Sequence, residues 1–401
     1  MSGRDARIRT DYRRLAPIAW VGMFVFGLAM ALLGAILPVV TTRLALDLRQ
    51  AGSLFSALNA AMLGTVLWLG PLMDRRGTRP VLAGGSLASA AGMAVVALAR
   101  SYPQLLAGLA LLGAAGVSLN VSTNTLVADL NPDPGSKSAA LNFLGVFFGI
   151  GALAIPLAIG RLIEALGLDG ILFSAAAISL VPGLAAVAVS FPPKPAVRGA
   201  PPSLRQLARD PLLRLFAALL FLQSGSEFIL SGYTSLFLTR EVRLGLRGAS
   251  YCLAGYWAAF MCIRVLLSFA LPKTPPEAVV RAGSLAAAGT VLLLANAREP
   301  ALAAVALVAT GASSGSIYPT VLGQAGTCFA SRAGSVYSLL FAVTLVGGAT
   351  LPWIVGAVGE TFGLRAALLL PALKAAGVYA LQRAIVRRWL GQSSPRETTP
   401  R

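Results

Sequence analysis

Long apolar stretches recur along the whole chain of 401 residues and limit what it can fold into. An α-helix needs about 20 consecutive apolar residues to cross the roughly 30 Å hydrocarbon core of a bilayer. Stretches of this length alternate with short polar segments, and only 12% of the residues are charged, too few to cover a soluble protein of this size. We therefore predict an all-α integral membrane protein with twelve transmembrane helices, near residues 16–39, 51–71, 78–99, 104–127, 139–160, 170–190, 213–237, 250–271, 279–296, 300–322, 334–357 and 365–387.

The positive charge of the chain indicates its orientation in the membrane. An even number of helices places both termini on one side, and the loops and tails on that side carry most of the 33 lysines and arginines. By the positive-inside rule this side is cytoplasmic, so we predict a multi-pass protein of the cytoplasmic membrane with both termini in the cytoplasm. The net charge of +18 then reflects orientation and attraction to anionic lipid, and no soluble basic segment is left to bind nucleic acid.

The residue types that catalysis and metal binding require are scarce. The chain contains no histidine, and its three cysteines (Cys252, Cys262 and Cys328) lack the spacing of a metal site. It also lacks a Gly-rich phosphate loop of the Gly-Lys-Ser/Thr type that would hold ATP. We therefore predict that the protein is not an enzyme and binds neither a metal nor a cofactor.

A polar segment rich in proline divides the chain near its middle. Prolines at 192, 193, 195, 201 and 202 disfavour a continuing helix, and the basic run that follows keeps the segment in water. We expect residues 1–190 to form an N-terminal six-helix bundle and 191–212 a cytoplasmic linker. Residues 213–388 would form a second six-helix bundle, followed by a cytoplasmic tail at 389–401.

The two predicted bundles also resemble each other in sequence. Segments 155–168 and 351–364 share a proline, two glycines, a glutamate and a leucine in the same order at one constant spacing. The shared glutamates are Glu164 and Glu360. Repeated halves are typical of transporters that work by alternating access, in which two bundles rock around a central site.

A short motif follows the second predicted helix. Residues 70–79 read Gly-Pro-Leu-Met-Asp-Arg-Arg-Gly-Thr-Arg, which resembles the signature loop of the major facilitator superfamily, with Thr78 as the departure. The resemblance implies twelve helices in two pseudo-symmetric bundles. A glycine permits a tight turn, and an aspartate with arginines can hold helix ends together in one conformation. The gating loop would consist of Gly70, Asp74, Arg75, Gly77 and Arg79.

Further motifs resemble one branch of that superfamily, the fucose–galactose–glucose:proton symporters. They are residues 224–227 (Ser-Gly-Ser-Glu), 256–257 (Tyr-Trp) and 315–320 (Gly-Ser-Ile-Tyr-Pro-Thr). The resemblance implies uptake of a sugar with a proton, or with sodium as in some relatives. The predicted helix at 16–39 departs from this branch because it lacks the carboxylate that some members use for protons.

Three ionisable residues, Glu227, Arg264 and Lys374, lie well inside predicted helices, where a charge is costly and usually serves a pathway. Lys374 lies in the last predicted helix, where we expect snorkelling or packing rather than a functional role. Glu227 is the only acid in such a position, and Arg264 lies in the next helix. We predict that Glu227 carries the proton-coupling step, with Arg264 as its counter-charge. The alternative is a static ion pair that holds the two helices together.

Neutral polar and aromatic side chains supply the candidate substrate contacts. Amides can both donate and accept hydrogen bonds, as sugar hydroxyls require, and aromatic rings can stack on the apolar face of a sugar. The alternative is hydrogen bonding between helices. The predicted substrate-binding residues are Asn120, Asn124, Asn142, Gln223, Tyr256, Trp257, Tyr318 and Gln324.

These observations together predict a secondary active transporter that works as a monomer in the lipid bilayer. Its partners would be a small organic solute, best matched by a sugar, and a co-transported proton. Two alternatives stay open at this point: a proton-driven exporter of hydrophobic compounds, and a membrane sensor or scaffold that no longer transports. A cavity lined by Asn, Gln and Trp would favour the sugar, and one lined by Phe, Leu and Met would favour export of hydrophobic compounds.

Overall fold

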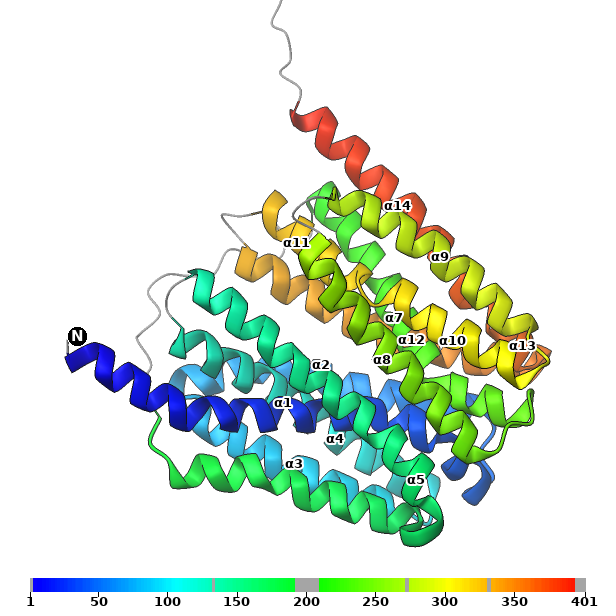
Figure 1. Ribbon diagram of the computed structural model, residues 1–401, viewed down its shortest axis with the longest axis horizontal. Coiled ribbons are helices and arrows are strands. Elements are labelled where there is room, and N and C mark those ends of the chain that lie inside the picture. Colours follow the sequence, from blue (N-terminus) through cyan, green and yellow to red (C-terminus); the bar gives the residue numbers. More distant parts are fainter. Residues whose placement is uncertain (1–2, 132–133, 192–208, 271–273, 330–332, 394–401) are drawn as a thin grey trace, which may run out of the picture.

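The computed structural model describes residues 3–131, 134–191, 209–270, 274–329 and 333–393, and the regular elements in these ranges are helices (Figure 1). Together they form an elongated bundle. The helices are α1 (Gly3–Arg43), α2 (Leu48–Arg76), α3 (Thr78–Leu98), α4 (Tyr102–Leu130), α5 (Pro134–Ala188), α7 (Pro211–Arg240), α8 (Leu246–Ala270), α9 (Pro276–Asn296), α10 (Pro300–Ser314), α11 (Ile317–Cys328), α12 (Ala333–Phe362), α13 (Leu364–Ala367) and α14 (Leu369–Ser393).

Local sequence signals set where several helices begin. Asp47 precedes α2 and forms a capping box with Gln50: its carboxylate accepts from the Gln50 amide N–H at 2.6 Å, and the Gln50 side chain accepts from the Asp47 N–H. Asp210 caps α7 with its carboxylate, which accepts from the backbone amides of Leu212 and Leu213. Prolines occupy the first turn of α4, α7, α9 and α10, where the missing N–H removes no helical bond.

The spans match the expected membrane protein. Within the described residues, eleven helical spans are long and apolar enough to cross a membrane. One of them covers 46 residues, which at 1.5 Å per residue is about twice the thickness of the hydrocarbon core. This span is broken at Gly167, whose backbone has φ +65°, and so contains two crossings of the membrane. The sequence suggested a loop at 161–169 between these crossings, whereas in the structure both belong to α5. Counted as two crossings, α5 brings the number of spans to twelve.

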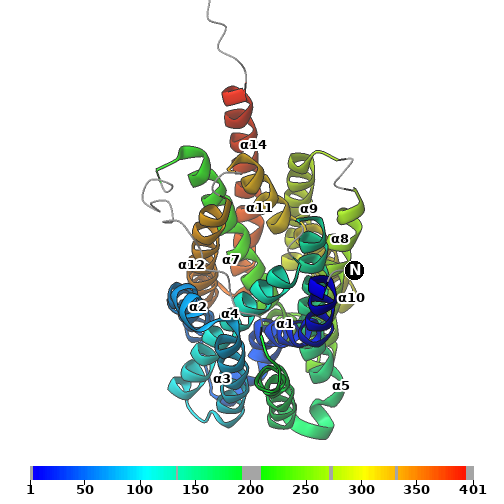
Figure 2. The same cartoon turned by 90° about the vertical axis from the view of Figure 1, so that its left-hand side faces the viewer.

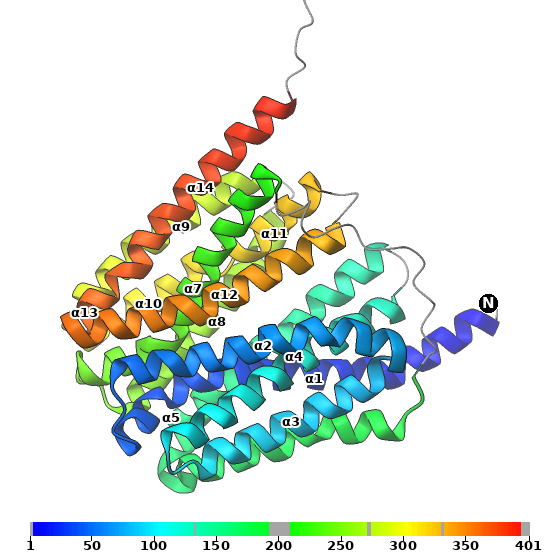
Figure 3. The same cartoon turned by 180° about the vertical axis from the view of Figure 1, so that it is seen from behind.

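The helices fall into two groups, which Figures 1, 2 and 3 show as two packed layers. In the first group α1 packs on α4 and α5, and α3 packs on α4 and α5. In the second group α8 packs on α10, and α14 packs on α7 and α9. We call these groups the N half (α1–α5) and the C half (α7–α14). Most of the predicted linker, 192–208, and the last residues of the predicted tail, 394–401, lie outside the described residues.

A guanidinium group ties the helix ends of the N half together at the end away from the chain termini. Arg43, the last residue of α1, donates to the backbone carbonyls of Ala97 and Ala99 at 2.8 and 2.7 Å. The same side chain forms an ion pair with Asp169 at 2.8 Å. Carbonyls at a helix C-terminus have no helical partner, so this arginine satisfies two of them. We call this arrangement the Arg43 clamp.

The C half contains an equivalent arrangement with the charges exchanged. Arg365 donates to the carbonyls of Ala295 and Ala297 at 3.0 and 2.8 Å and pairs with the carboxylate of Glu241 at 3.2 Å. Its guanidinium also lies over the ring of Phe237. Ala295 and Ala297 follow Ala97 and Ala99 by 198 residues, so the same carbonyls are held in both halves. In the N half the arginine ends the first helix of the half, whereas in the C half it lies in the short helix α13, just before the last helix. We call this arrangement the Arg365 clamp.

Contacts between the halves concentrate at the same end as the clamps. The N–H of Leu48, in the first turn of α2, has no helical acceptor and donates to the carboxylate of Glu360 on α12 at 2.8 Å. Ser56 and Asn59 continue this line along α2, donating to α12 carbonyls at 2.6 and 3.2 Å. Glu164, the glutamate of the other repeated segment, forms an ion pair with Arg247 at the start of α8 at 2.6 Å. Both glutamates of the repeated segments therefore join the halves.

The halves separate towards the other end. Figure 3 shows α2 and α12 side by side near α13 and moving apart towards the end that carries the N-terminus. In that part of α2 the side chains of Leu67 and Trp68 are 66% and 76% exposed. The structure is thus closed at the end away from the termini, where these contacts join the halves, and α2 and α12 diverge towards the end near the termini. With cytoplasmic termini, as the charge distribution predicts, the closed end faces outward.

The Arg365 clamp leads to a prediction for stability. Arg365→Gln removes the donors of two helix-end carbonyls, which should cost about 1–3 kcal/mol and lower the melting temperature of the purified protein in detergent. Arg298→Gln is the matched control, since Arg298 is an exposed arginine in the neighbouring loop. Equal melting temperatures for the two variants would show that the clamp contributes nothing to stability.

The Glu360 contact leads to a prediction for the conformational equilibrium. Glu360→Gln weakens a charge-assisted hydrogen bond to the N-terminus of α2. Because the site is exposed, we expect the closed outer end to lose about 1 kcal/mol of stability, which changes the ratio of open to closed outer ends roughly fivefold. Spin labels introduced by Arg100→Cys and Arg298→Cys, in a background without native cysteines, would measure the distance between the outer loops. Thr361→Ala, which alters only a bond within α12, is the control. An unchanged distance distribution in the Glu360 variant would contradict this role.

Candidate functional site

Glu227 lies on α7 and is held by its own helix. Gln223 stands one turn earlier and donates from Nε2 to the Glu227 carboxylate at 3.0 Å. The same Gln223 amide lies 3.4 Å from the carbonyl oxygen of Ser314, where α10 ends. Gln223 therefore orients the carboxylate and links α7 to α10, and Glu227 as a whole residue is half-buried.

Arg264 lies on α8 and is held by a helix interruption. The helical run is broken between α10 and α11, and Nε of Arg264 donates to the carbonyl of Gly315 in this break at 2.7 Å. The guanidinium also stacks over the ring of Phe260, with 4.4 Å from its carbon to the ring centre. A break in a membrane helix leaves backbone groups that need a partner, and Arg264 supplies one.

Glu227 and Arg264 attract each other without direct contact. Their charges interact, yet no ion pair shorter than 4.0 Å joins these two described residues. Tyr256 and Tyr318 lie in the field of both charges. The hydroxyl of Tyr256 and the indole N–H of Trp257 are buried without a hydrogen-bond partner. The arrangement thus combines one carboxylate, one guanidinium group and two polar atoms without hydrogen-bond partners.

Aromatic rings surround this group and connect the two halves. Trp257 packs edge-on against Tyr256 and Phe260, with ring centres 5.5 and 5.4 Å apart. Across the interface, Trp257 meets Phe148 of α5 at 6.3 Å, and Phe148 meets Phe26 of α1 at 5.2 Å. The candidate site is therefore a carboxylate beside an aromatic wall contributed by both halves. We call Gln223, Glu227, Tyr256, Trp257, Phe260, Arg264 and Tyr318 the Glu227 cluster.

The structure brings together some of the predicted site residues and separates others. Gln223, Tyr256, Trp257, Tyr318, Glu227 and Arg264 share the Glu227 cluster. Asn120 and Asn124 lie on α4 and bond to each other, with the Asn124 amide donating to both the carbonyl and the side chain of Asn120. Gln324 lies on α11 and accepts from Gln382 on α14 at 3.0 Å, inside the C half. Asn142 falls in α5, and its side chain lies outside the described residues.

Two aromatic residues that the sequence did not single out contact predicted site residues. The ring of Phe260 lies under the Arg264 guanidinium, and the ring of Phe148 meets that of Trp257. Phe260 has a sequence signal, because it stands one helical turn from both Tyr256 and Arg264. Phe148 belongs to the other half, so no local pattern could have linked it to Trp257.

The predicted gating loop is described only in part. Gly70, Asp74 and Arg75 fall in the last turns of α2, and the side chain of Asp74 lies outside the described residues. Gly77 joins α2 to α3 with φ +77°, a conformation that favours glycine. Arg79 donates to the carbonyl of Val187 near the end of α5, and Arg75 is exposed. The gating role of this loop stays a prediction.

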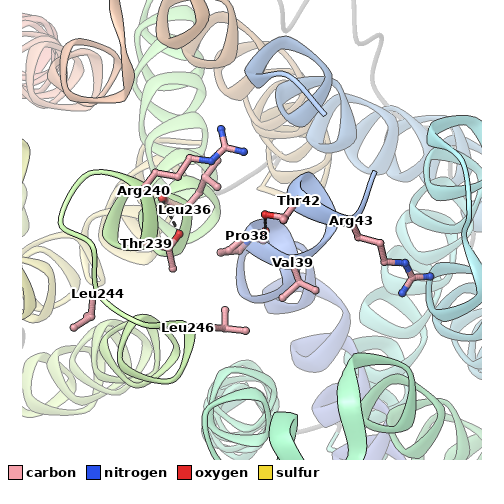
Figure 4. A pocket seen from close by; sticks show the side chains of 9 residues that line it. All are labelled: Pro38, Val39, Thr42, Arg43, Leu236, Thr239, Arg240, Leu244 and Leu246. Atoms are coloured by element: carbon pink, nitrogen blue, oxygen red, sulfur yellow. Dashed lines mark hydrogen bonds between the residues drawn. The ribbon is translucent and has the colours of Figure 1, made fainter. Parts of the chain in front are cut away.

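A separate cavity of about 560 Å³ lies at the closed end (Figure 4). It is bounded by α1 from the N half and by α7, α8 and the segment between them from the C half. Figure 4 shows the Arg43 guanidinium pointing away from the C-half residues, consistent with its place in the Arg43 clamp. No member of the Glu227 cluster lines this cavity. Its lining residues are Pro38, Val39, Thr42, Arg43, Leu236, Thr239, Arg240, Leu244 and Leu246.

Comparison with known proteins agrees with this architecture. The multidrug resistance protein MdtG of Escherichia fergusonii is 26% identical over 397 residues, covering 93% of this chain and 94% of that protein. Among solved structures, an inward-facing bacterial homologue of the human lysosomal transporter Spinster superposes with a TM-score of 0.77 at 14% identity, over 95% of this chain and 98% of that one. The fucose:proton symporter of Escherichia coli superposes with a TM-score of 0.66 at 21% identity, over 94% and 99%.

The family model of the Major Facilitator Superfamily matches residues 19–352. This range contains the signature loop, the first of the repeated segments and the whole Glu227 cluster. The expected family is therefore confirmed, along with an all-helical fold that spans the membrane several times. The chain belongs to the major facilitator superfamily, whose members are transporters that bind small molecules within the membrane.

Proposed function

We propose that this protein exports amphipathic organic compounds across the cytoplasmic membrane in exchange for protons, working as a monomer by alternating access. The observation that carries the proposal is a carboxylate, Glu227, which has one hydrogen bond from Gln223 and lies beside an aromatic wall that both halves build. Apolar and aromatic walls with few polar groups suit ligands that are themselves mostly apolar. The name of the MdtG relative, which covers almost the whole chain, supports the same substrate class.

Glu227 is suited to couple transport to protons. A carboxylate inside a membrane protein is costly when charged, and here it has one hydrogen bond from Gln223 and a distant counter-charge in Arg264. A bound proton removes its attraction to Arg264, and a cationic ligand can replace the proton. Because Arg264 is fixed to the break between α10 and α11, a change of charge at Glu227 acts on α7, α8 and this break together.

Sugar uptake is the second candidate, supported by the amides of Asn120 and Asn124 and by the fold shared with the fucose symporter. Both amides lie on α4. If this helix lines the pathway, their donors and acceptors can bond to the hydroxyl groups of a sugar. Their bonds to each other leave fewer groups free for a sugar, which is why we place this candidate second. Proteoliposomes with an imposed pH gradient would separate the candidates by comparing transport of ethidium with that of radiolabelled fucose. Transport of fucose and not ethidium would favour uptake of a sugar, and transport of neither probe would contradict both candidates and favour a sensor or scaffold.

The coupling role of Glu227 leads to a prediction. Glu227→Gln keeps the size and the hydrogen bond to Gln223 but cannot change charge, so proton-driven accumulation of ethidium should fall at least about tenfold. Exchange of ethidium across the membrane without a gradient should persist, because the aromatic wall is unchanged. Both rates can be measured in the same proteoliposomes.

Glu299→Gln is the matched control, since Glu299 is an exposed acid at the start of α10, far along the chain from the Glu227 cluster. It should transport like the unaltered protein. Undiminished accumulation in Glu227→Gln would place proton coupling elsewhere or exclude it. Loss of both accumulation and exchange would indicate a structural role for Glu227 instead.

A further inference from the structure

A second cavity of about 560 Å³ lies inside the C half, between α7, α9, α11 and α14. None of its lining residues comes from the N half, so it is separate from a pathway between the halves. Two of its lining residues, Pro276 and Glu277, begin α9. The lining residues are Phe216, Pro276, Glu277, Pro319, Thr320, Gly323, Gln324, Thr327, Cys328, Gln382, Ile385 and Val386.

Two polar atoms in the wall of this cavity lack partners. Gln382 donates from Nε2 to Oε1 of Gln324 at 3.0 Å, and this bond uses one polar atom of each amide. The remaining atoms, Nε2 of Gln324 and Oε1 of Gln382, are buried without a hydrogen bond. A buried polar atom without a partner costs about 1–3 kcal/mol, so a ligand that supplies the missing bonds would be favoured. The pair offers one donor and one acceptor.

A carboxylate at the same cavity sets the charge of the ligand. Glu277 lies in the first turn of α9, and within the described part of the chain no ion pair reaches its carboxylate. Arg281, one turn further on, directs its Nε to the Glu277 carbonyl at 3.3 Å. Among the described residues no ion-pair partner reaches this acid, in a chain with 33 lysines and arginines against 15 acids. Of the described residues that line the cavity, Glu277 is the one with a formal charge.

We propose that this cavity binds a small organic cation of the amidine, guanidine or amine type with an apolar body, at a site separate from the Glu227 cluster. The cationic N–H groups bond to Glu277 and to Oε1 of Gln382, and the apolar body packs against Phe216 and Ile385. A charged N–H donor facing a carboxylate is among the stronger hydrogen bonds in proteins.

The position of α11 connects this site to transport. One end of α11 carries Tyr318, which lies in the field of Glu227 and Arg264, and its next turns carry Gln324 and the cavity wall. A ligand in the cavity therefore contacts the same short helix that borders the Glu227 cluster. The site is suited to regulate transport from within the C half.

Cys328 lines the cavity and provides a probe for the test. Cys252→Ser and Cys262→Ser leave Cys328 as the single thiol of the full-length protein, whose labelling by N-ethylmaleimide is then timed in detergent. Benzamidine is the cationic probe, and benzamide is its neutral counterpart of nearly equal shape. At ten times its dissociation constant, benzamidine should slow labelling about tenfold, with saturation, and benzamide should have little effect.

Three variants assign the protection to the proposed site. In this background Glu277→Gln should reduce protection by benzamidine to the level of benzamide, whereas the exposed control Glu299→Gln should keep it. Glu227→Gln should also keep it, which separates this site from the proposed transport site. The same comparison can be made from the rise in melting temperature with benzamidine, should Cys328 label too slowly to time.

Several results would overturn the proposal. They are equal protection by benzamide and benzamidine, protection that survives Glu277→Gln, and protection that disappears in Glu227→Gln. The first two would describe an apolar cavity without charge selection, and the third would describe a ligand of the transport site. Absence of any effect of benzamidine on both labelling and melting temperature would also reject the site.

Discussion

A backbone N–H or C=O group in a bilayer must find its partner inside the protein, and the rest of this structure depends on that constraint. Long helices satisfy it along their length but leave groups free at their ends and breaks. Few charged residues are available, and several are placed at such points. Arg43 and Arg365 hold carbonyls at helix ends, Arg264 holds the carbonyl of Gly315, and Glu360 accepts the free N–H of Leu48. These side chains thus stabilise helix ends and breaks, and Glu360 also joins the two halves.

The apolar stretches predicted the helices because their length is dictated by the bilayer, which is the same everywhere along the chain. Two features could not be predicted in this way. The break between α10 and α11 lies inside an apolar run that reads as one helix, and the joined crossings of α5 depend on the backbone of Gly167. Neither changes the hydropathy of its segment. Both depend on how helices pack in three dimensions.

The same distinction applies to the Glu227 cluster. Glu227 and Arg264 could be identified from the sequence because charges inside apolar helices are rare. Gln324 could not be separated from the other amides, since its partner Gln382 is on another helix and both look alike in sequence. Phe148, which carries the aromatic wall into the N half, is one of many phenylalanines. Rarity made the ionisable residues visible, and common residue types needed the structure.

The exchanged charges of the Arg43 and Arg365 clamps affect how the ancestry of the two halves can be recognised. Arg43 of the N half corresponds to Glu241 of the C half, and Asp169 corresponds to Arg365. An alignment of the halves by residue identity would therefore pair residues of opposite charge at both positions and score each as a mismatch. What has been kept is a guanidinium bound to the same pair of carbonyls, whichever helix supplies it. Ancestry in such duplicated chains is therefore better traced through shared backbone acceptors than through matching side chains.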